Sequence, residues 1–132
     1  MGRPLILETT FLIDLEREHH RGKPGAAVDF LEANDDARLY LPFVVAGELA
    51  AGISMREKPR WEGFLGPFYV LPSTREVSWH YGRAYRHLHD NGRLIGANDL
   101  WIGATGLAYH MPVVTRNLEH FRRVPGLEVE TY

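Results

Sequence analysis

Short runs of apolar residues alternate along the chain with longer segments whose apolar residues lie three or four positions apart. The short runs are typical of buried strands, and the longer segments are typical of helices with one apolar face. Residues 16–23 are polar and are expected to form a loop or the fraying end of a helix. The predicted strands are residues 5–7, 37–41, 68–71, 113–115 and 127–129, and the predicted helices are residues 9–15, 24–33, 43–53, 59–65, 74–91, 99–110 and 117–121.

Strands that alternate with helices indicate a parallel sheet with helices on both faces. We therefore expect an α/β fold, formed by a single domain over residues 1–132, whose central sheet is mostly parallel. The chain is long enough to bury a hydrophobic core. Two helix starts carry specific signals, because Asn98 is a good N-cap and Ser73 forms a capping-box pattern with Glu76.

Three apolar segments each contain a single charged residue, and in each segment that residue is a carboxylate. Glu8 ends the first predicted strand, Glu48 lies in the helix after the second, and Asp99 begins a strongly apolar helix. Ligands of parallel sheets collect at the carboxyl ends of the strands, so these side chains are expected to meet at one edge. Thr115 and Asn117 follow a later strand and would reach the same edge.

Each of these polar residues also has a purely structural explanation. Asp99 would stabilise the first turn of its helix, and Glu8 would accept hydrogen bonds from the turn that follows it. Glu48 would reach solvent past small neighbours, and Asn117 would be a turn residue. One shared site explains all four positions together. Oxygen ligands without thiolate or imidazole partners suit Mg²⁺ or Mn²⁺, which serve phosphate chemistry by orienting water and stabilising charge on phosphorus.

Composition narrows the function classes further. The chain has no cysteine, which excludes disulfides, thiolate zinc sites and a cysteine nucleophile. It has no apolar run near the roughly 20 residues that cross a bilayer and no recognisable signal peptide, so we expect a cytoplasmic protein without a membrane partner. A glycine-rich phosphate loop is missing, which argues against a nucleoside triphosphatase. Arg83 and Arg86 share the long helix at residues 74–91 with several histidines, and this face is either solvated or a contact for RNA phosphates.

Four stretches of the sequence resemble the motifs of one family, in order and at suitable spacing. They are residues 6–14, residues 42–49 followed by Gly52, residues 96–104, and residues 114–117 with Phe121 and residues 125–127. Together they resemble a PIN-domain ribonuclease, specifically a VapC-type toxin of a bacterial toxin–antitoxin pair. The resemblance covers nearly the whole chain.

This resemblance implies a PIN-like α/β/α sandwich and endonucleolytic cleavage of RNA that depends on Mg²⁺ or Mn²⁺. It places Glu8, Glu48 and Asp99 at the acidic, metal-binding positions and Asn117 at the polar position of the fourth motif. It also implies a homodimer and a cognate antitoxin, a segment of which occupies the active-site groove. The residues expected to contact the substrate are Thr9, Thr10, Thr115, Arg116, Arg83 and Arg86.

Two positions depart from the family pattern. The first acid is normally aspartate, whereas this chain has Glu8, and the acid often found before the last phenylalanine is replaced by His120, with Glu119 beside it. The departure at Glu8 leaves an alternative function: a catalytically impaired PIN scaffold that binds RNA or an antitoxin without cutting. A receiver-like phosphoacceptor domain fits less well, because no lysine follows Lys58.

Overall fold

The computed structural model describes residues 2–132 and contains a five-stranded sheet in the order β3-β2-β1-β4-β5. Every neighbouring pair of strands is parallel, which confirms the expected sheet. The central strand β1 is fully buried at its last three residues, because helices cover both of its faces. The strands are β1 (Pro4–Leu7), β2 (Arg38–Pro42), β3 (Tyr69–Leu71), β4 (Val113–Val114) and β5 (Val129–Glu130).

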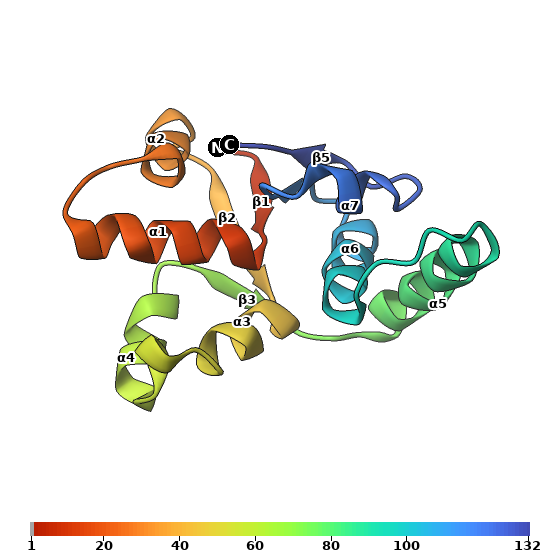
Figure 1. The fold of residues 1–132 in the computed structure, drawn as a ribbon, viewed down its shortest axis with the longest axis horizontal. Coiled ribbons are helices and arrows are strands. Elements are labelled where there is room, and N and C mark those ends of the chain that lie inside the picture. The colour runs from red at the N-terminus through yellow and green to blue at the C-terminus, as the bar shows by residue number, and fades with distance from the viewer. Residues whose placement is uncertain (1) are drawn as a thin grey trace.

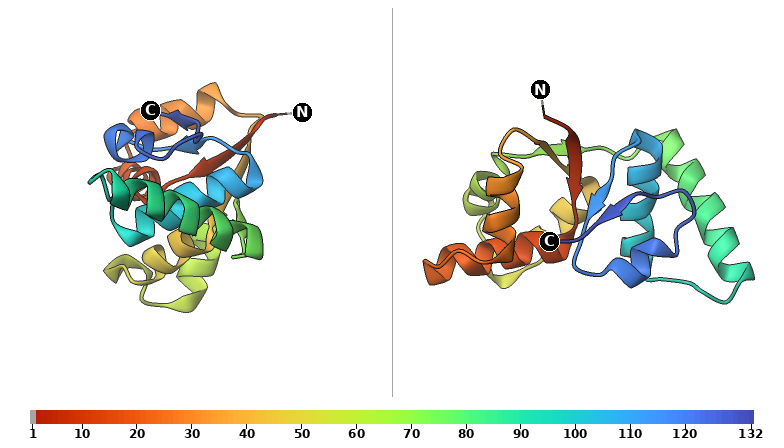
Figure 2. Two further views of the ribbon diagram at one scale, coloured as in Figure 1. Left: turned by 90° about the vertical axis from the view of Figure 1, so that its right-hand side faces the viewer. Right: turned by 90° about the horizontal axis from the view of Figure 1, so that it is seen from above.

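The helices divide between the two faces of the sheet according to their order along the chain. The first four lie on one face and the last three on the other (Figure 1 and Figure 2). This division follows from right-handed crossovers, because the chain moves from β1 outwards to β3 and then back past β1 to β4. The helices are α1 (Thr9–Arg21), α2 (Ala26–Ala33), α3 (Phe43–Ala50), α4 (Lys58–Leu65), α5 (Arg75–Asp90), α6 (Ala97–Tyr109) and α7 (Leu118–Arg122), with a 3₁₀ turn η1 (Ile53–Met55) between α3 and α4.

The main core lies around β1 and packs helices against both faces of the sheet. Phe11 of α1 and Phe121 of α7 are the largest side chains that are fully buried, and their helices lie on opposite faces of the sheet (Figure 1). Phe11 makes edge contacts with Phe30 of α2 and with the C-terminal Tyr132. This packing fixes the start of α1, where the polar residues of interest lie.

Several predicted helix and strand ends are wrong. Helix α1 does not end near residue 15 but continues to Arg21, because Gly22 closes it in the left-handed conformation and Glu18 is held by the next helix. Helix α2 begins after Gly25 rather than at Pro24, and the helix predicted over residues 43–53 ends at Ala50. The last strand starts two residues later than predicted, because Leu127 is part of a turn and donates to the carbonyl of Val124.

Both predicted caps are also wrong. Thr74, not Ser73, caps α5 by accepting a hydrogen bond from the backbone N–H of Val77. Helix α6 starts after Gly96, so Asn98 lies inside its first turn and no side chain caps it. No helix in residues 2–132 is long and apolar enough to cross a membrane.

Candidate active site

The candidate residues come from elements that end at the same edge of the sheet. Glu8 follows β1, and Glu48 lies in α3, which begins directly after β2. Thr115 follows β4, which pairs with β1 on the side opposite β2. Asp99 lies in the first turn of α6 on the other face. Because the strands are parallel, their carboxyl ends bring these residues together, as the sequence predicts.

Glu8 is the most constrained of the three acids. Its side chain is 3% exposed, and it caps α1. Its Oε1 accepts hydrogen bonds from the hydroxyls of Thr10 (2.7 Å) and Thr115 (2.6 Å), and its Oε2 accepts one from the backbone N–H of Thr10 (3.0 Å). A carboxylate has about four lone-pair sites, so three are occupied and one on Oε2 is free for another partner.

Glu48 is held by the residue beside this cap. The hydroxyl of Thr9 donates to Glu48 Oε1 across 2.7 Å, while the hydroxyl of Thr10 serves Glu8. The consecutive threonines at the start of α1 therefore orient one acid each. The sequence predicts that Thr9, Thr10 and Thr115 contact the substrate. In the structure their hydroxyls donate to Glu48 and Glu8, and contact with a substrate stays a prediction.

Asp99 shares the electrostatic environment of the other two acids. Burial raises the pKa of its carboxyl, the negative charge of Glu8 raises it further, and that of Glu48 adds to the rise. His120 opposes the rise in this pKa. Three carboxylates that repel one another need a nearby cation or proton to offset the cost of their charge.

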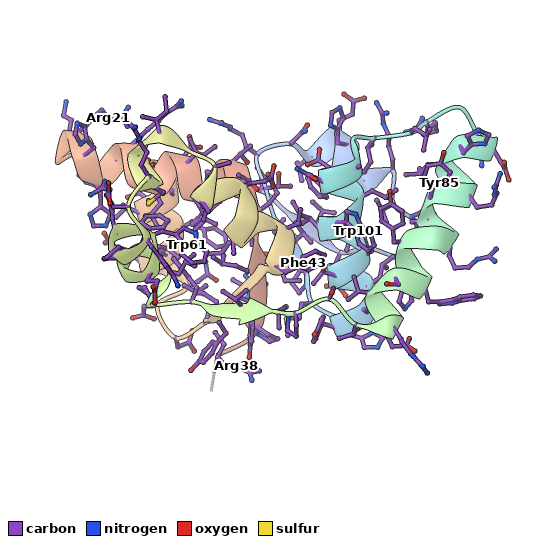
Figure 3. All side chains as sticks on the ribbon, turned by 90° about the horizontal axis from the view of Figure 1, so that it is seen from below. Arg21, Arg38, Phe43, Trp61, Tyr85 and Trp101 are labelled. Atoms are coloured by element: carbon purple, nitrogen blue, oxygen red, sulfur yellow. The ribbon has the colours of Figure 1, made fainter. Side chains whose placement is uncertain are left out.

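The aromatic packing of α6 holds Asp99 at this edge. Trp101 lies two residues further along the helix, between Phe43 at the start of α3 and α5 (Figure 3). Its ring is 5.9 Å from that of Phe43 and stacks at 3.9 Å on Tyr81 of α5. The same tryptophan therefore links the helices that carry Asp99 and Glu48.

Asn117 and Thr115 form a chain of hydrogen bonds that leads back to Glu8. The backbone N–H of Asn117 donates to the Thr115 hydroxyl (2.9 Å), which itself donates to Glu8. The side-chain amide of Asn117 contacts Nδ1 of His120 at 2.9 Å, and this nitrogen is 3.6 Å from Oδ2 of Asp99. His120 is a site residue that the sequence reasoning did not assign, although its place in the fourth motif was noted as a departure.

The arginines predicted to contact RNA do not all lie beside the carboxylates. Arg116 follows Thr115 directly, and Asp14 holds its guanidinium at 3.0 Å. Arg83 lies over the ring of Trp79 (5.5 Å) and Arg86 contacts Asp90 (3.5 Å), all within α5 on the outer flank of α6. These contacts do not bring Arg83 or Arg86 to the carboxylates, and their role in RNA binding stays a prediction.

An apolar groove of about 700 Å³ lies between α1 and α4, away from these residues. Its walls include Leu15, His19, Phe64 and Phe68. None of the candidate site residues lines it. The candidate active site is therefore the sheet edge that carries Glu8, Glu48 and Asp99 (the carboxylate edge) and not this groove.

The donor chemistry of the edge fits a hard divalent cation. Asp99, Glu48 and the free lone pair of Glu8 offer carboxylate oxygens, and Asn117 offers an amide oxygen. Within residues 2–132, no three acidic or histidine side chains already converge at the spacing of metal ligands. A bound cation would draw these side chains together and relieve the repulsion that raises the pKa of Asp99.

Comparisons with known proteins agree with this geometry. A profile of the PIN domain matches residues 5–127. The chain is 30% identical to Ribonuclease VapC of Rickettsia bellii, over 96% of this chain and 95% of that one. It is 29% identical to Ribonuclease VapC19 of Mycobacterium tuberculosis, over 93% and 96% of the two chains.

Solved structures share the same fold. The crystal structure of VapBC2 from Rickettsia felis, bound to a DNA fragment from its promoter, superposes with a TM-score of 0.83 at 24% identity, over 98% of both chains. The DNA-bound VapBC structure from Salmonella typhimurium gives a TM-score of 0.76 at 25% identity, over 99% of this chain and 98% of that one. With a family profile and full-length relatives in agreement, the chain belongs to the PIN-domain family.

Proposed function

We propose that this protein is a metal-dependent endoribonuclease and the toxin of a type II toxin–antitoxin pair. The carrying observation is the set of three carboxylates at one sheet edge, where burial and the negative charges of Glu8 and Glu48 raise the pKa of Asp99. The curated relatives named as VapC ribonucleases support the reaction class. Residues 1–132 would form one catalytic domain acting on RNA in the cytoplasm.

Glu8, Glu48 and Asp99 would hold the metal, with Mg²⁺ or Mn²⁺ as the candidates. A divalent ion in such a site activates water and stabilises the charge that develops on phosphorus. The chain's own hydroxyls orient these acids, since Thr9 holds Glu48 and Thr10 with Thr115 holds Glu8. Such positioning matters, because a displacement of about 1 Å can cost on the order of 100-fold in rate.

Substrate contacts would come from the residues around this edge. Arg116 carries a guanidinium beside Thr115, and Asp14 orients it from α1. Guanidinium groups bind phosphate oxygens in a planar, bidentate manner, which suits an RNA backbone. The amide of Asn117 would help to orient the scissile phosphate. Arg83 and Arg86 would contact the RNA further from the cut.

A cognate antitoxin and a homodimer complete the proposal. The solved structures that share this fold include VapBC assemblies from Rickettsia felis and Salmonella typhimurium, which support an antitoxin partner for this chain. The antitoxin would cover the carboxylate edge and keep RNA away from it. Co-purification of the toxin with its antitoxin should therefore suppress cleavage, and proteolysis of the antitoxin should restore it.

The direct test incubates the purified protein with structured RNAs in EDTA, in Mg²⁺ and in Mn²⁺. We expect discrete cleavage products with a divalent ion and none with EDTA. RNA that stays intact in both metals would contradict the proposal.

One observation favours the alternative of a binding scaffold. Three protein donors already occupy most of the Glu8 carboxylate, which leaves it a single lone pair for a metal. If the protein retains RNA or antitoxin in a binding assay but cuts RNA in neither metal, the scaffold is the correct function.

A further inference from the structure

A second pocket, of about 320 Å³, lies along α1 beside the candidate active site. Its wall also includes the start of α2 and the residue that follows Thr115. The lining residues with charged side chains are Asp14, Arg17, Glu18, Arg21 and Arg116. Because Thr115 donates a hydrogen bond to Glu8, the pocket borders the carboxylate edge at Arg116.

Both acids of this pocket already have partners within the protein. Glu18 is buried and accepts three backbone N–H groups at the start of α2. Asp14 accepts the hydroxyl of Tyr132 at 2.6 Å and pairs with Arg116 at 3.0 Å. The helix start and the two acids are thus occupied by contacts of the fold itself, and the arginines remain to meet a ligand.

Arg116 is held from behind and presents its guanidinium to the pocket. The side chain of Asp14 is 15% exposed and that of Arg116 is 57% exposed, so the acid lies beneath the cation. Asp14 contacts only Nη1 of the guanidinium. Of the five N–H donors of an arginine, the three on Nε and Nη2 are therefore available to a ligand.

Arg17 and Arg21 are exposed and lie one turn of α1 apart, about 6 Å along the helix axis. None of the ion pairs within residues 2–132 includes either of them. With Arg116 they place three guanidinium groups with available donors around one pocket. Such a set suits a phosphate group, because its charged oxygens accept short, bidentate hydrogen bonds from guanidinium groups.

We propose that this pocket binds a backbone phosphate of the RNA at a distance from the phosphate that is cut. The inference rests on the proposed function for the identity of the ligand as RNA. Arg17 comes nine residues after Glu8, which is about 13 Å along α1. At about 3.4 Å per stacked nucleotide, this distance corresponds to about four nucleotides. The RNA therefore leaves the carboxylate edge along α1.

The test measures RNA binding in EDTA, so that cleavage does not interfere. The probe is a fluorescein-labelled, single-stranded RNA oligonucleotide, whose anisotropy is followed at several KCl concentrations. One phosphate contact contributes about 0.7 to the slope of log K against log salt for a single strand, so Arg17→Gln with Arg21→Gln should lower the slope by about 0.7. The same double variant should weaken binding at least about tenfold, to a similar extent for different RNA sequences.

Two further variants separate the charge of the pocket from other effects. Arg17→Lys with Arg21→Lys keeps both charges and should keep the wild-type slope. Arg38→Gln is the matched control, because it removes one exposed arginine where β2 begins, at the opposite edge of the sheet from the carboxylates (Figure 3). It should leave both slope and affinity unchanged. Melting curves check that each variant is folded.

Neutral methylphosphonate groups, placed at one position of the RNA at a time, identify the phosphate that is bound. At a single position the neutral group should weaken binding to the wild type but not to the double glutamine variant. Equal losses for both proteins at every position would contradict a specific contact between this pocket and one phosphate.

The inference is overturned if the double glutamine variant keeps the wild-type slope and affinity, or if the wild type binds no RNA. Cleavage in Mg²⁺ or Mn²⁺ by the wild type would then still support the nuclease. RNA that is bound through the pocket but stays intact in both metals would support the inference and contradict the nuclease.

An acidic protein segment is the other candidate occupant, because Arg17 and Arg21 also border the apolar groove between α1 and α4. Poly-L-glutamate is the probe for this occupant. A double glutamine variant that loses poly-L-glutamate binding but binds RNA like the wild type would assign the arginines to a protein partner and overturn the inference.

Discussion

Glu18→Gln is expected to lower stability strongly, although the residue lies in a segment predicted to be a loop or a fraying end. Its side chain is 5% exposed and accepts three backbone hydrogen bonds at the start of α2, from Gly25 (2.8 Å), Ala27 (3.1 Å) and Val28 (2.9 Å). The carboxylate therefore caps a helix other than its own and joins α1 to α2.

The magnitude follows from these bonds. Glutamine can keep the two bonds to Oε1, but its amide nitrogen would face the N–H of Ala27 and lose that bond. A hydrogen bond to a charged group contributes about 1.5–3 kcal/mol, and the two retained bonds weaken toward about 1 kcal/mol each. The neutral amide costs less to bury than the carboxylate, which offsets part of this loss, so the expected net loss is about 2–4 kcal/mol. For a chain of this length, with about 2.1 cal/mol/K of unfolding entropy per residue, the melting temperature falls by about 7–14 °C.

The effect should depend on pH in a defined direction. Burial raises the pKa of the Glu18 carboxyl, but the bonds from Val28, Ala27 and Gly25 together lower it below its ordinary value. The carboxylate thus stabilises the fold above the unfolded pKa of about 4.3, and this contribution is lost as pH falls through the lower folded value. The difference between wild type and Glu18→Gln should be largest near pH 7 and shrink towards pH 3.

Thermal and urea unfolding at pH 7 and at pH 3 measure this difference. Glu32→Gln, an exposed change on α2, is the control and should shift the melting temperature by less than about 2 °C. A Glu18→Gln variant within about 3 °C of the wild type at pH 7, which is roughly 1 kcal/mol, would refute the capping explanation, as would a deficit that grows in acid.

Four further changes test the site and its packing. Glu48→Gln should raise the melting temperature in EDTA, because it removes one charge that raises the pKa of Asp99; a clear decrease would show that its hydrogen bond matters more. Glu8→Asp restores the usual acid of the family and should increase RNA cleavage at least about tenfold. Cleavage at the wild-type rate in both Mg²⁺ and Mn²⁺ would contradict this expectation. Gly106→Ala should cost about 1–3 kcal/mol, since the added Cβ would lie 2.7 Å from a side chain and 3.1 Å from a backbone oxygen. Gly82→Ala on α5 meets nothing within 4 Å and should instead stabilise the protein in the same unfolding assay.

The sequence predicts the arrangement of strands and helices well because hydrophobic periodicity directly reflects burial. It predicts helix ends poorly because these depend on contacts between segments. Helix α1 continues to Arg21 because Glu18 binds the next helix across a loop, and no local pattern around residue 18 indicates that bond. Likewise Thr74 rather than Ser73 caps α5, since both can cap and only the backbone conformation decides between them.

The residues of the candidate site also differ in how well the sequence predicts them. Glu8, Glu48 and Asp99 are visible in the sequence because each is the lone charge in an apolar segment. His120 and Glu119 are neighbours in a polar turn, and the sequence does not show which side chain faces Asp99. The structure shows that His120 does, while Glu119 pairs with Arg123.

Cleavage of an end-labelled RNA by the wild type and by Asp99→Asn at saturating Mn²⁺ tests the central claim most directly. The account predicts metal-dependent products with the wild type and a rate lower by about 100-fold or more with Asp99→Asn, because a charge at the reacting centre is lost. Asp29→Asn, an exposed acid in the first turn of α2, is the matched control and should cleave like the wild type. If Asp99→Asn cleaves the RNA as fast as the wild type does, the account is contradicted.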